Sequence, residues 1–167
     1  MELPKRKRMR LEGYDYSGSG VYFLTLCSKD KKPIFSQIVG RGILDAPLTE
    51  LTAYGQSVKD AITYINQKNQ NLAIEHSVIM PNHVHLLVRV NEQTGGAHRS
   101  ESRATGEAIP KFVSSLKRYT NKLSGTELWQ TGYYDHIVRD EQDYRARWEY
   151  IDGNPARWTE DEYNKQG

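Results

Sequence analysis

Residues 72–90 read LAIEHSVIMPNHVHLLVRV, in which two mostly apolar stretches are separated by the dipeptide Pro81-Asn82. Both stretches are rich in branched apolar residues and have the length of a strand, and Pro-Asn is typical of turns. The sequence therefore predicts strands over 72–80 and 83–90 that form a β-hairpin. This hairpin is the centre of the predicted fold.

The flanking segments supply the remaining strands and helices of an α+β fold. A buried strand is expected over 21–28 (VYFLTLCS), and the apolar spacing indicates a helix from Leu48 to about Ile65. Three elements follow the hairpin: a helix over 109–123, a short strand over 133–139, and a helix over 140–154 with Asp140 as its N-cap. This order predicts a ferredoxin-like split β-α-β sandwich, an antiparallel sheet with helices mainly on one face.

Length and composition indicate one compact domain spanning 1–167, because the chain is 37% hydrophobic and 26% charged. Within it we expect a basic N-terminal arm over 1–20 and a mobile loop over 91–108. No apolar run is long enough to span a membrane, and no secretory signal follows the basic start. The single Cys27 excludes an intramolecular disulfide. A cytoplasmic protein is therefore expected.

Positive charge is concentrated although the net charge is only +2. The N-terminal arm carries five basic residues: Lys5, Arg6, Lys7, Arg8 and Arg10. The second helix is expected to bury Ile109, Phe112, Val113, Leu116 and Leu123 and to leave four basic residues on its other sides, Lys111, Lys117, Arg118 and Lys122. Both clusters suit a phosphate backbone, and ordinary solvated surface is the alternative.

Strand periodicity sends His83 and His85 to one face of the sheet and Val84 to the other. Two such imidazoles can hold a divalent cation and leave positions open for substrate oxygens, whereas a pair of surface histidines is the simpler alternative. His76 and His136 lie on neighbouring segments. Each could orient a ligand imidazole or serve as an ordinary structural residue.

The third helix places a tyrosine and an amide outside its core stripe. Tyr144, Trp148 and Ile151 have the spacing of that stripe, while Tyr150 lies about 200° around the helix from Trp148. Asn154, four residues later, shares the side of Tyr150. The alternative is an exposed aromatic residue followed by a C-capping asparagine.

Four segments together resemble a known family: LEGYDYSGSGVYFLTLCSKD at 11–30, VGRGILDAPLT at 39–49, MPNHVHLLV at 80–88 and LWQTGYYDHIVRDEQDYRARWEYIDGNPARW at 128–158. They are similar to the REP-associated tyrosine transposases, a branch of the single-tyrosine HUH (IS200-like) transposases. The specific features are the HxH strand, a downstream helix with Y-x-x-x-N, and the closing NPARW, in this order.

The resemblance implies a site and a chemistry. It makes His83, His85 and Asn154 the ligands of a divalent metal, Mg²⁺ or Mn²⁺, and Tyr150 the catalytic nucleophile. The implied function is a metal-dependent single-stranded DNA endonuclease and strand transferase that cuts next to DNA hairpins through a 5′-phosphotyrosine intermediate. Arg147 and Lys117 are candidates to stabilise the developing charge.

Several alternatives stay open at this point. A domesticated, non-transposing protein that only binds DNA hairpins would have the same motifs. A metal-dependent hydrolase and an RNA-binding module are further classes, although the chain has no RNP1-like run. Tyr119 is the second candidate nucleophile, and Tyr14 and Tyr16 could stack on unpaired bases. The partner implied is single-stranded or hairpin DNA, bound by a monomer or a homodimer.

Overall fold

The computed structural model describes residues 20–40, 47–91 and 108–164. Most of the predicted N-terminal arm and of the 91–108 loop lies outside the described residues, as do Tyr14 and Tyr16. A four-stranded sheet has the order β4-β5-β1-β6 and is antiparallel throughout. Its strands are β1 (Gly20–Cys27), β4 (Leu72–Ile79), β5 (His83–Val90) and β6 (Tyr134–Val138).

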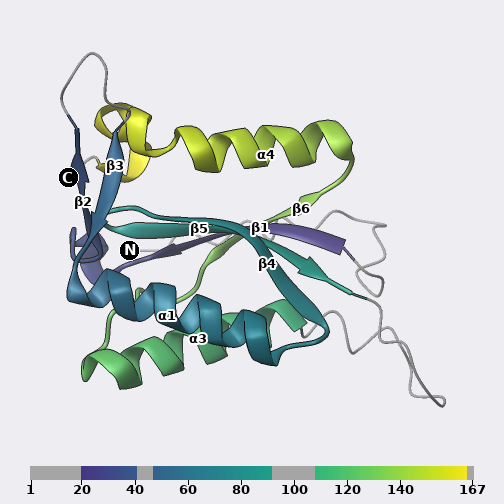
Figure 1. Ribbon diagram of the computed structural model, residues 1–167, viewed down its shortest axis with the longest axis horizontal. Coiled ribbons are helices and arrows are strands. Elements are labelled where there is room, and N and C mark those ends of the chain that lie inside the picture. The colour runs from purple at the N-terminus through teal and green to yellow at the C-terminus, as the bar shows by residue number, and fades with distance from the viewer. Residues whose placement is uncertain (1–19, 41–46, 92–107, 165–167) are drawn as a thin grey trace, which may run out of the picture.

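Helices cover both faces of this sheet unequally. α1 (Ala53–Lys68) and α3 (Ala108–Ser124) lie side by side on one face, and α4 (Glu141–Gly153) crosses the other (Figure 1). The predicted ferredoxin-like α+β sandwich with helices mainly on one face is therefore confirmed. No helix in the described part of the chain is long and apolar enough to cross a membrane.

Alternation along β5 divides its side chains between two clusters. Val84, Leu86 and Val88 pack into the larger core beneath α1 and α3. Leu87, on the opposite face, packs with Phe23 of β1 in a smaller cluster under α4. His83 and His85 have the same parity as Leu87, so they lie on the α4 face, as the strand period predicts.

The helix predicted from Leu48 begins later than expected. Leu48–Leu51 forms β3, which pairs with β2 (Ser36–Val39) in a separate two-stranded sheet. Thr52 is the N-cap of α1, and its Oγ1 accepts a hydrogen bond from the Gly55 amide at 3.2 Å. A Cβ atom on Gly55 would lie 2.0 Å from the Phe35 carbonyl oxygen, so this first turn of the helix requires glycine.

The last predicted core residue of α3 is not in the core. Leu123 is 48% exposed, whereas Thr120 is fully buried and follows Leu116 by one turn. The Thr120 hydroxyl accepts a hydrogen bond from the Trp129 indole at 2.7 Å, which satisfies both buried polar groups. The stripe therefore ends in a polar contact that apolar spacing does not reveal.

The third helix follows its prediction closely. The Asp140 side chain accepts a hydrogen bond from the Asp143 amide at 2.8 Å, the geometry of an N-cap. Tyr144, Trp148 and Ile151 pack on the smaller cluster, as their spacing predicts. After α4 the chain continues as two 3-10 turns, η2 (Pro155–Glu160) and η3 (Glu162–Asn164).

Candidate metal and nucleophile site

Two buried histidines stand at the start of β5. His83 is 0% exposed and His85 is 1% exposed, and their ring centroids are 4.5 Å apart. The simpler alternative, a pair of surface histidines, is therefore wrong. Burying an imidazole is unfavourable unless its nitrogens find partners, so the partners of each ring decide what the pair can do.

Asn82 fixes the tautomer of His83. The Asn82 Nδ2 donates to the backbone carbonyls of Lys31 and Tyr163, at 3.2 and 2.7 Å, so its Oδ1 is left as the acceptor. This Oδ1 lies 2.9 Å from the His83 Nδ1, which must be the donor. In the neutral ring the proton is then on Nδ1, and Nε2 presents a lone pair.

The Nδ1 of His85 also has a partner, which comes from the neighbouring strand. Its Nδ1 lies 2.8 Å from the Thr25 hydroxyl, and Thr25 stands opposite His85 in the β1–β5 pairing. Burial lowers the pKa of His83 to about 4. Burial also lowers the pKa of His85 well below its usual value, and the positive charge of Arg147, like that of His83 when it is protonated, acts in the same direction. Both rings are therefore neutral at pH 7 and available as metal ligands.

Three buried side-chain atoms in the described part of the chain have no hydrogen-bond partner: His83 Nε2, His85 Nε2 and Asn154 Oδ1. Asn154 is 2% exposed and is the C-cap of α4. Its side chain is close enough to His83 to raise the pKa of that ring, against the larger effect of burial. An unpaired buried acceptor costs about 1–3 kcal/mol, so three together call for a positive partner.

The donor set fits a divalent cation. Two imidazole nitrogens and an amide oxygen suit Mn²⁺ better than Mg²⁺, which prefers oxygen ligands only. Among the described residues, no three His, Cys, Asp or Glu side chains are grouped as metal ligands. A site at the two histidines therefore needs the Asn154 amide.

Tyr150 lies against this set rather than in solvent. Its ring centroid is 5.2 Å from that of His85 and 5.8 Å from that of Phe23, edge-on in both cases. Burial and the negative charge of Asp161 raise the pKa of Tyr150, while Asn154 and Arg147 oppose this shift. The tyrosine is thus half-buried and packs on the same smaller cluster as Tyr144 and Trp148, which its place outside their spacing did not predict. The alternative of an exposed aromatic residue is wrong.

Of the two candidate helper cations, Arg147 lies beside the tyrosine. Its guanidinium stands 5.3 Å from the centroid of the Phe23 ring, and its Nε donates to Asp143 at 3.3 Å. Lys117 instead donates to the backbone carbonyls of Gln130 and Gly132, at 2.8 and 2.7 Å. The structure therefore gives Lys117 a role in anchoring the segment after α3.

His76 and His136 pair with aspartates of α4. His76 Nε2 lies 2.6 Å from Asp152 and its ring stacks on Trp148, with 4.1 Å between centroids. His136 Nε2 lies 2.8 Å from Asp143. His76 and His136 therefore have the structural role and do not contact the histidines of the site. The imidazoles of the site are oriented by Asn82 and Thr25, which the sequence analysis missed.

The basic residues of α3 lie across the sheet from this site. Lys111, Lys117, Arg118 and Lys122 belong to the helix that covers the face opposite α4 (Figure 1). Tyr119, the second candidate nucleophile, stacks there on Tyr64, with ring centroids 5.0 Å apart and planes 12° from parallel. Of the two candidate nucleophiles from the sequence, Tyr150 is therefore the one that the fold brings next to the histidines.

The turns after α4 close over the histidines, which the sequence analysis did not anticipate. The Tyr163 ring centroid is 4.5 Å from that of His83, and Asp161 Oδ2 lies 3.8 Å from the His83 Nε2. Short 3-10 turns have no apolar periodicity, so neither residue gave a signal beyond its place in an acidic C-terminal stretch.

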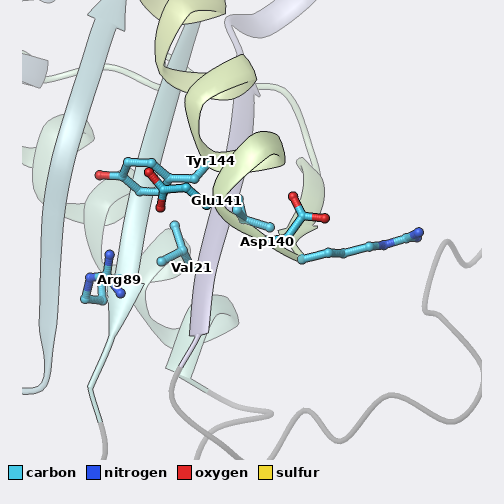
Figure 2. A pocket seen from close by; sticks show the side chains of 7 residues that line it. Val21, Arg89, Asp140, Glu141 and Tyr144 are labelled. Atoms are coloured by element: carbon cyan, nitrogen blue, oxygen red, sulfur yellow. The ribbon is translucent and has the colours of Figure 1, made fainter.

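An open pocket lies at the other end of α4, near its N-cap Asp140. Figure 2 shows its lining residues, among them Val21, Arg89 and Tyr144. Arg89 is paired with Glu75, which also accepts a hydrogen bond from the Tyr144 hydroxyl at 3.0 Å. These polar groups satisfy one another, and the pocket is separate from the histidine site.

Two proteins of Haemophilus influenzae are similar to this chain in sequence. A protein of Haemophilus influenzae with no assigned function is 30% identical over 171 residues, which is 94% of this chain and 92% of that protein. A second protein of that organism, provisionally named a REP-associated tyrosine transposase, is 24% identical over 148 residues, 86% of this chain and 74% of its own length.

One solved structure is that of a REP-associated tyrosine transposase bound to a REP hairpin. It shares the fold with a TM-score of 0.56 and 21% identity, over 89% of this chain and 73% of that chain. The family model of IS200-like transposases matches residues 21–154, which include the four-stranded sheet except Gly20, both histidines and α4. The chain therefore belongs to the family of IS200-like transposases.

Proposed function

We propose that this protein is a metal-dependent single-stranded DNA endonuclease and strand transferase that cuts next to DNA hairpins through a 5′-phosphotyrosine intermediate. One observation carries the proposal: His83 Nε2, His85 Nε2 and Asn154 Oδ1 are buried without partners, and the Tyr150 ring lies against His85. Neutral metal-binding atoms beside a tyrosine suit the transfer of a phosphodiester to a phenolic oxygen.

Each residue has a defined part in this chemistry. His83, His85 and Asn154 would hold a divalent cation, which, when bound, offsets negative charge on the attacked phosphate. The Tyr150 oxygen forms a bond to phosphorus while the bond from phosphorus to the 3′-oxygen breaks. The tyrosine then carries the 5′-phosphate, and the 3′-oxygen leaves with a proton as a hydroxyl that can later reverse the step.

The surroundings of Tyr150 explain why a positive partner is needed. Burial and the charge of Asp161 raise the pKa of the phenol, so little phenolate forms at pH 7 without compensation. Arg147, one turn earlier on α4, already lowers this pKa, and its positive charge favours the phenolate. A cation between the histidines and Asn154 would act in the same direction.

Hairpin DNA is the proposed partner. The solved relative was bound to a REP hairpin, and the α3 face of this chain exposes Lys111, Arg118 and Lys122. We propose that these residues and the N-terminal Lys5, Arg6, Lys7, Arg8 and Arg10 contact the phosphate backbone, and that Lys117, whose ammonium already donates to two carbonyls, contributes its charge only. The same contacts would serve a monomer or a homodimer.

A covalent-capture experiment tests the function. Hairpin oligonucleotides with single-stranded flanks, taken from the DNA next to the gene, are labelled at the 3′ end or at the 5′ end and mixed with protein and Mn²⁺ or Mg²⁺. A 3′ label should appear in a denaturant-resistant protein band, and a 5′ label in a shortened free strand. Tyr150→Phe and His83→Ala should abolish both products, whereas Tyr119→Phe should keep them.

The possible failures have distinct meanings. Hairpin binding without an adduct in any metal would support the domesticated protein that only recognises DNA. An adduct that survives Tyr150→Phe would contradict the assignment of the nucleophile, and an adduct formed in the presence of EDTA would contradict the metal requirement.

A further inference from the structure

Asp161, between η2 and η3, is the one buried acidic residue of the described part of the chain. Its side chain is 3% exposed, and its Oδ1 accepts a hydrogen bond from the Tyr163 amide at 2.8 Å. The other oxygen, Oδ2, lies 3.8 Å from the His83 Nε2. A buried carboxylate is costly unless a positive group or several donors compensate it. Burial raises the pKa of Asp161 and outweighs the Tyr163 amide and the Asn154 side chain, which favour its charged form.

The facing atoms of Asp161 and His83 are both acceptors. Because Asn82 requires the His83 proton on Nδ1, the neutral ring turns a bare nitrogen toward the carboxylate. A proton on Nε2 would make a charge-assisted hydrogen bond, and such bonds are about 2.7–2.9 Å long. The 3.8 Å separation is too long for that bond and leaves the two lone pairs facing each other.

The three ligands assigned in the proposed function are uncharged. Two neutral imidazoles and an amide would leave both positive charges of a divalent cation uncompensated in a place shielded from water. Asp161 stands beside two of these ligands, since it contacts the His83 edge and interacts with the Asn154 side chain. Its charge is opposite to that of the cation.

We propose that Asp161 is the charged residue next to the three ligands of this metal site, and that it sets the affinity by neutralising one positive charge of the cation from the His83 side without being a ligand itself. The proposal rests on the proposed function, because it uses the same cation. Asp161 acts through the cation and not on the DNA, so it is a positioning residue.

Mn²⁺ binding to the full chain, measured by calorimetry, tests the proposal. Asp161→Asn keeps the size of the side chain and an oxygen for the Tyr163 amide but removes the charge. It should weaken Mn²⁺ binding at least tenfold, and Asp161→Glu should stay within about threefold of the wild type. Glu160→Gln, which removes a neighbouring exposed charge, is the matched control and should change the affinity less than twofold.

Thermal unfolding separates this role from a structural one. Without metal, Asp161→Asn should be at least as stable as the wild type, because the amide nitrogen can donate to His83 Nε2 and ends the contact between two acceptors. With Mn²⁺, the rise in Tm should be smaller in the variant. A lower Tm without metal, together with a rise in Tm on adding Mn²⁺ equal to that of the wild type, would overturn the proposal.

His83→Ala distinguishes this inference from the proposed function. If His83→Ala leaves the Mn²⁺ affinity unchanged, the metal site itself is wrong. If His83→Ala abolishes binding while Asp161→Asn stays within twofold of the wild type, only the role of Asp161 is overturned.

Discussion

On one face of β5, Val84, Leu86 and Val88 pack against α1 and α3; on the other, His83 and His85 lie under the end of α4 and the turns that follow. All five side chains are at most 1% exposed, so the two faces do not differ in burial. They differ in whether they contain buried polar atoms without hydrogen-bond partners. The side chains of the apolar face have no polar atoms, whereas His83 Nε2 and His85 Nε2 on the histidine face have no hydrogen-bond partner.

This difference indicates that the histidine face lowers the folding stability and that its buried atoms serve a function instead. Burial of an apolar side chain in a close-packed core stabilises the fold, while burial of an unpartnered imidazole nitrogen in the same strand destabilises it. Sites that break the rules of a stable core are expected to be functional. Substitutions on the two faces should therefore have opposite signatures, one in stability and the other in chemistry.

The largest expected effect is on the histidine face. Tyr150→Phe should reduce the yield of covalent protein–DNA adduct by at least about 10³-fold, because it removes the nucleophilic oxygen. The free energy of unfolding should change by less than about 1 kcal/mol, since the ring still packs on Phe23. Gel quantification and urea unfolding measure the two quantities. Equal losses of adduct in Tyr150→Phe and Tyr119→Phe would contradict the assignment.

The apolar face should give the reverse signature. Leu86→Ala leaves a cavity beneath α1 and α3 and should lower the free energy of unfolding by about 2–5 kcal/mol. The Mn²⁺ affinity of the folded protein should stay within about threefold of the wild type. Urea unfolding and calorimetry test this, and a tenfold loss of affinity would mean that the two faces are not separate.

Acid should weaken the fold through the histidine face. The pKa of His83 is about 4 in the folded protein and near 6.5 when unfolded, so between these values the unfolded chain binds the proton first. Because of His83, the free energy of unfolding should therefore fall by about 2 kcal/mol when the pH is lowered from 7.5 to 5. Metal-free unfolding at both pH values should show this loss in the wild type and less of it in His83→Gln. An identical pH dependence in the two proteins would contradict the lowered pKa.

A smaller effect is expected from the residue that orients His85. Thr25→Val keeps the shape of the side chain but removes the hydroxyl beside Nδ1. Mn²⁺ affinity should fall about 10-fold or more, as is typical when the partner of a ligand imidazole is lost. Calorimetry measures this loss, and Thr120→Val, on the other side of the sheet, is the control. Unchanged affinity in Thr25→Val would show that the ring does not need this partner.

The parts of the site that follow from local periodicity could be predicted. His83 and His85 share a face because a strand alternates, and Asn154 lies near Tyr150 because four residues make about one helical turn. The main strands and the α3 and α4 helices were found by the same means. Leu48 and Leu51 fit both a helix and a strand, so the short β2–β3 pair was missed.

The supporting residues could not be predicted because their partners are distant in sequence. Thr25 reaches His85 through strand pairing, and Asp161 reaches His83 through two short turns without periodicity. Asn82 precedes His83 directly, yet its role depends on carbonyls supplied from two other segments. Such contacts depend on the assembled fold and not on any spacing within one element.

Anomalous diffraction from crystals soaked in Mn²⁺ is the most direct test of the claim that the unpartnered atoms form a metal site beside Tyr150. The expected result is a single strong peak within about 2.0–2.4 Å of His83 Nε2, His85 Nε2 and Asn154 Oδ1. A peak elsewhere, or none at these atoms under saturating Mn²⁺, would contradict it.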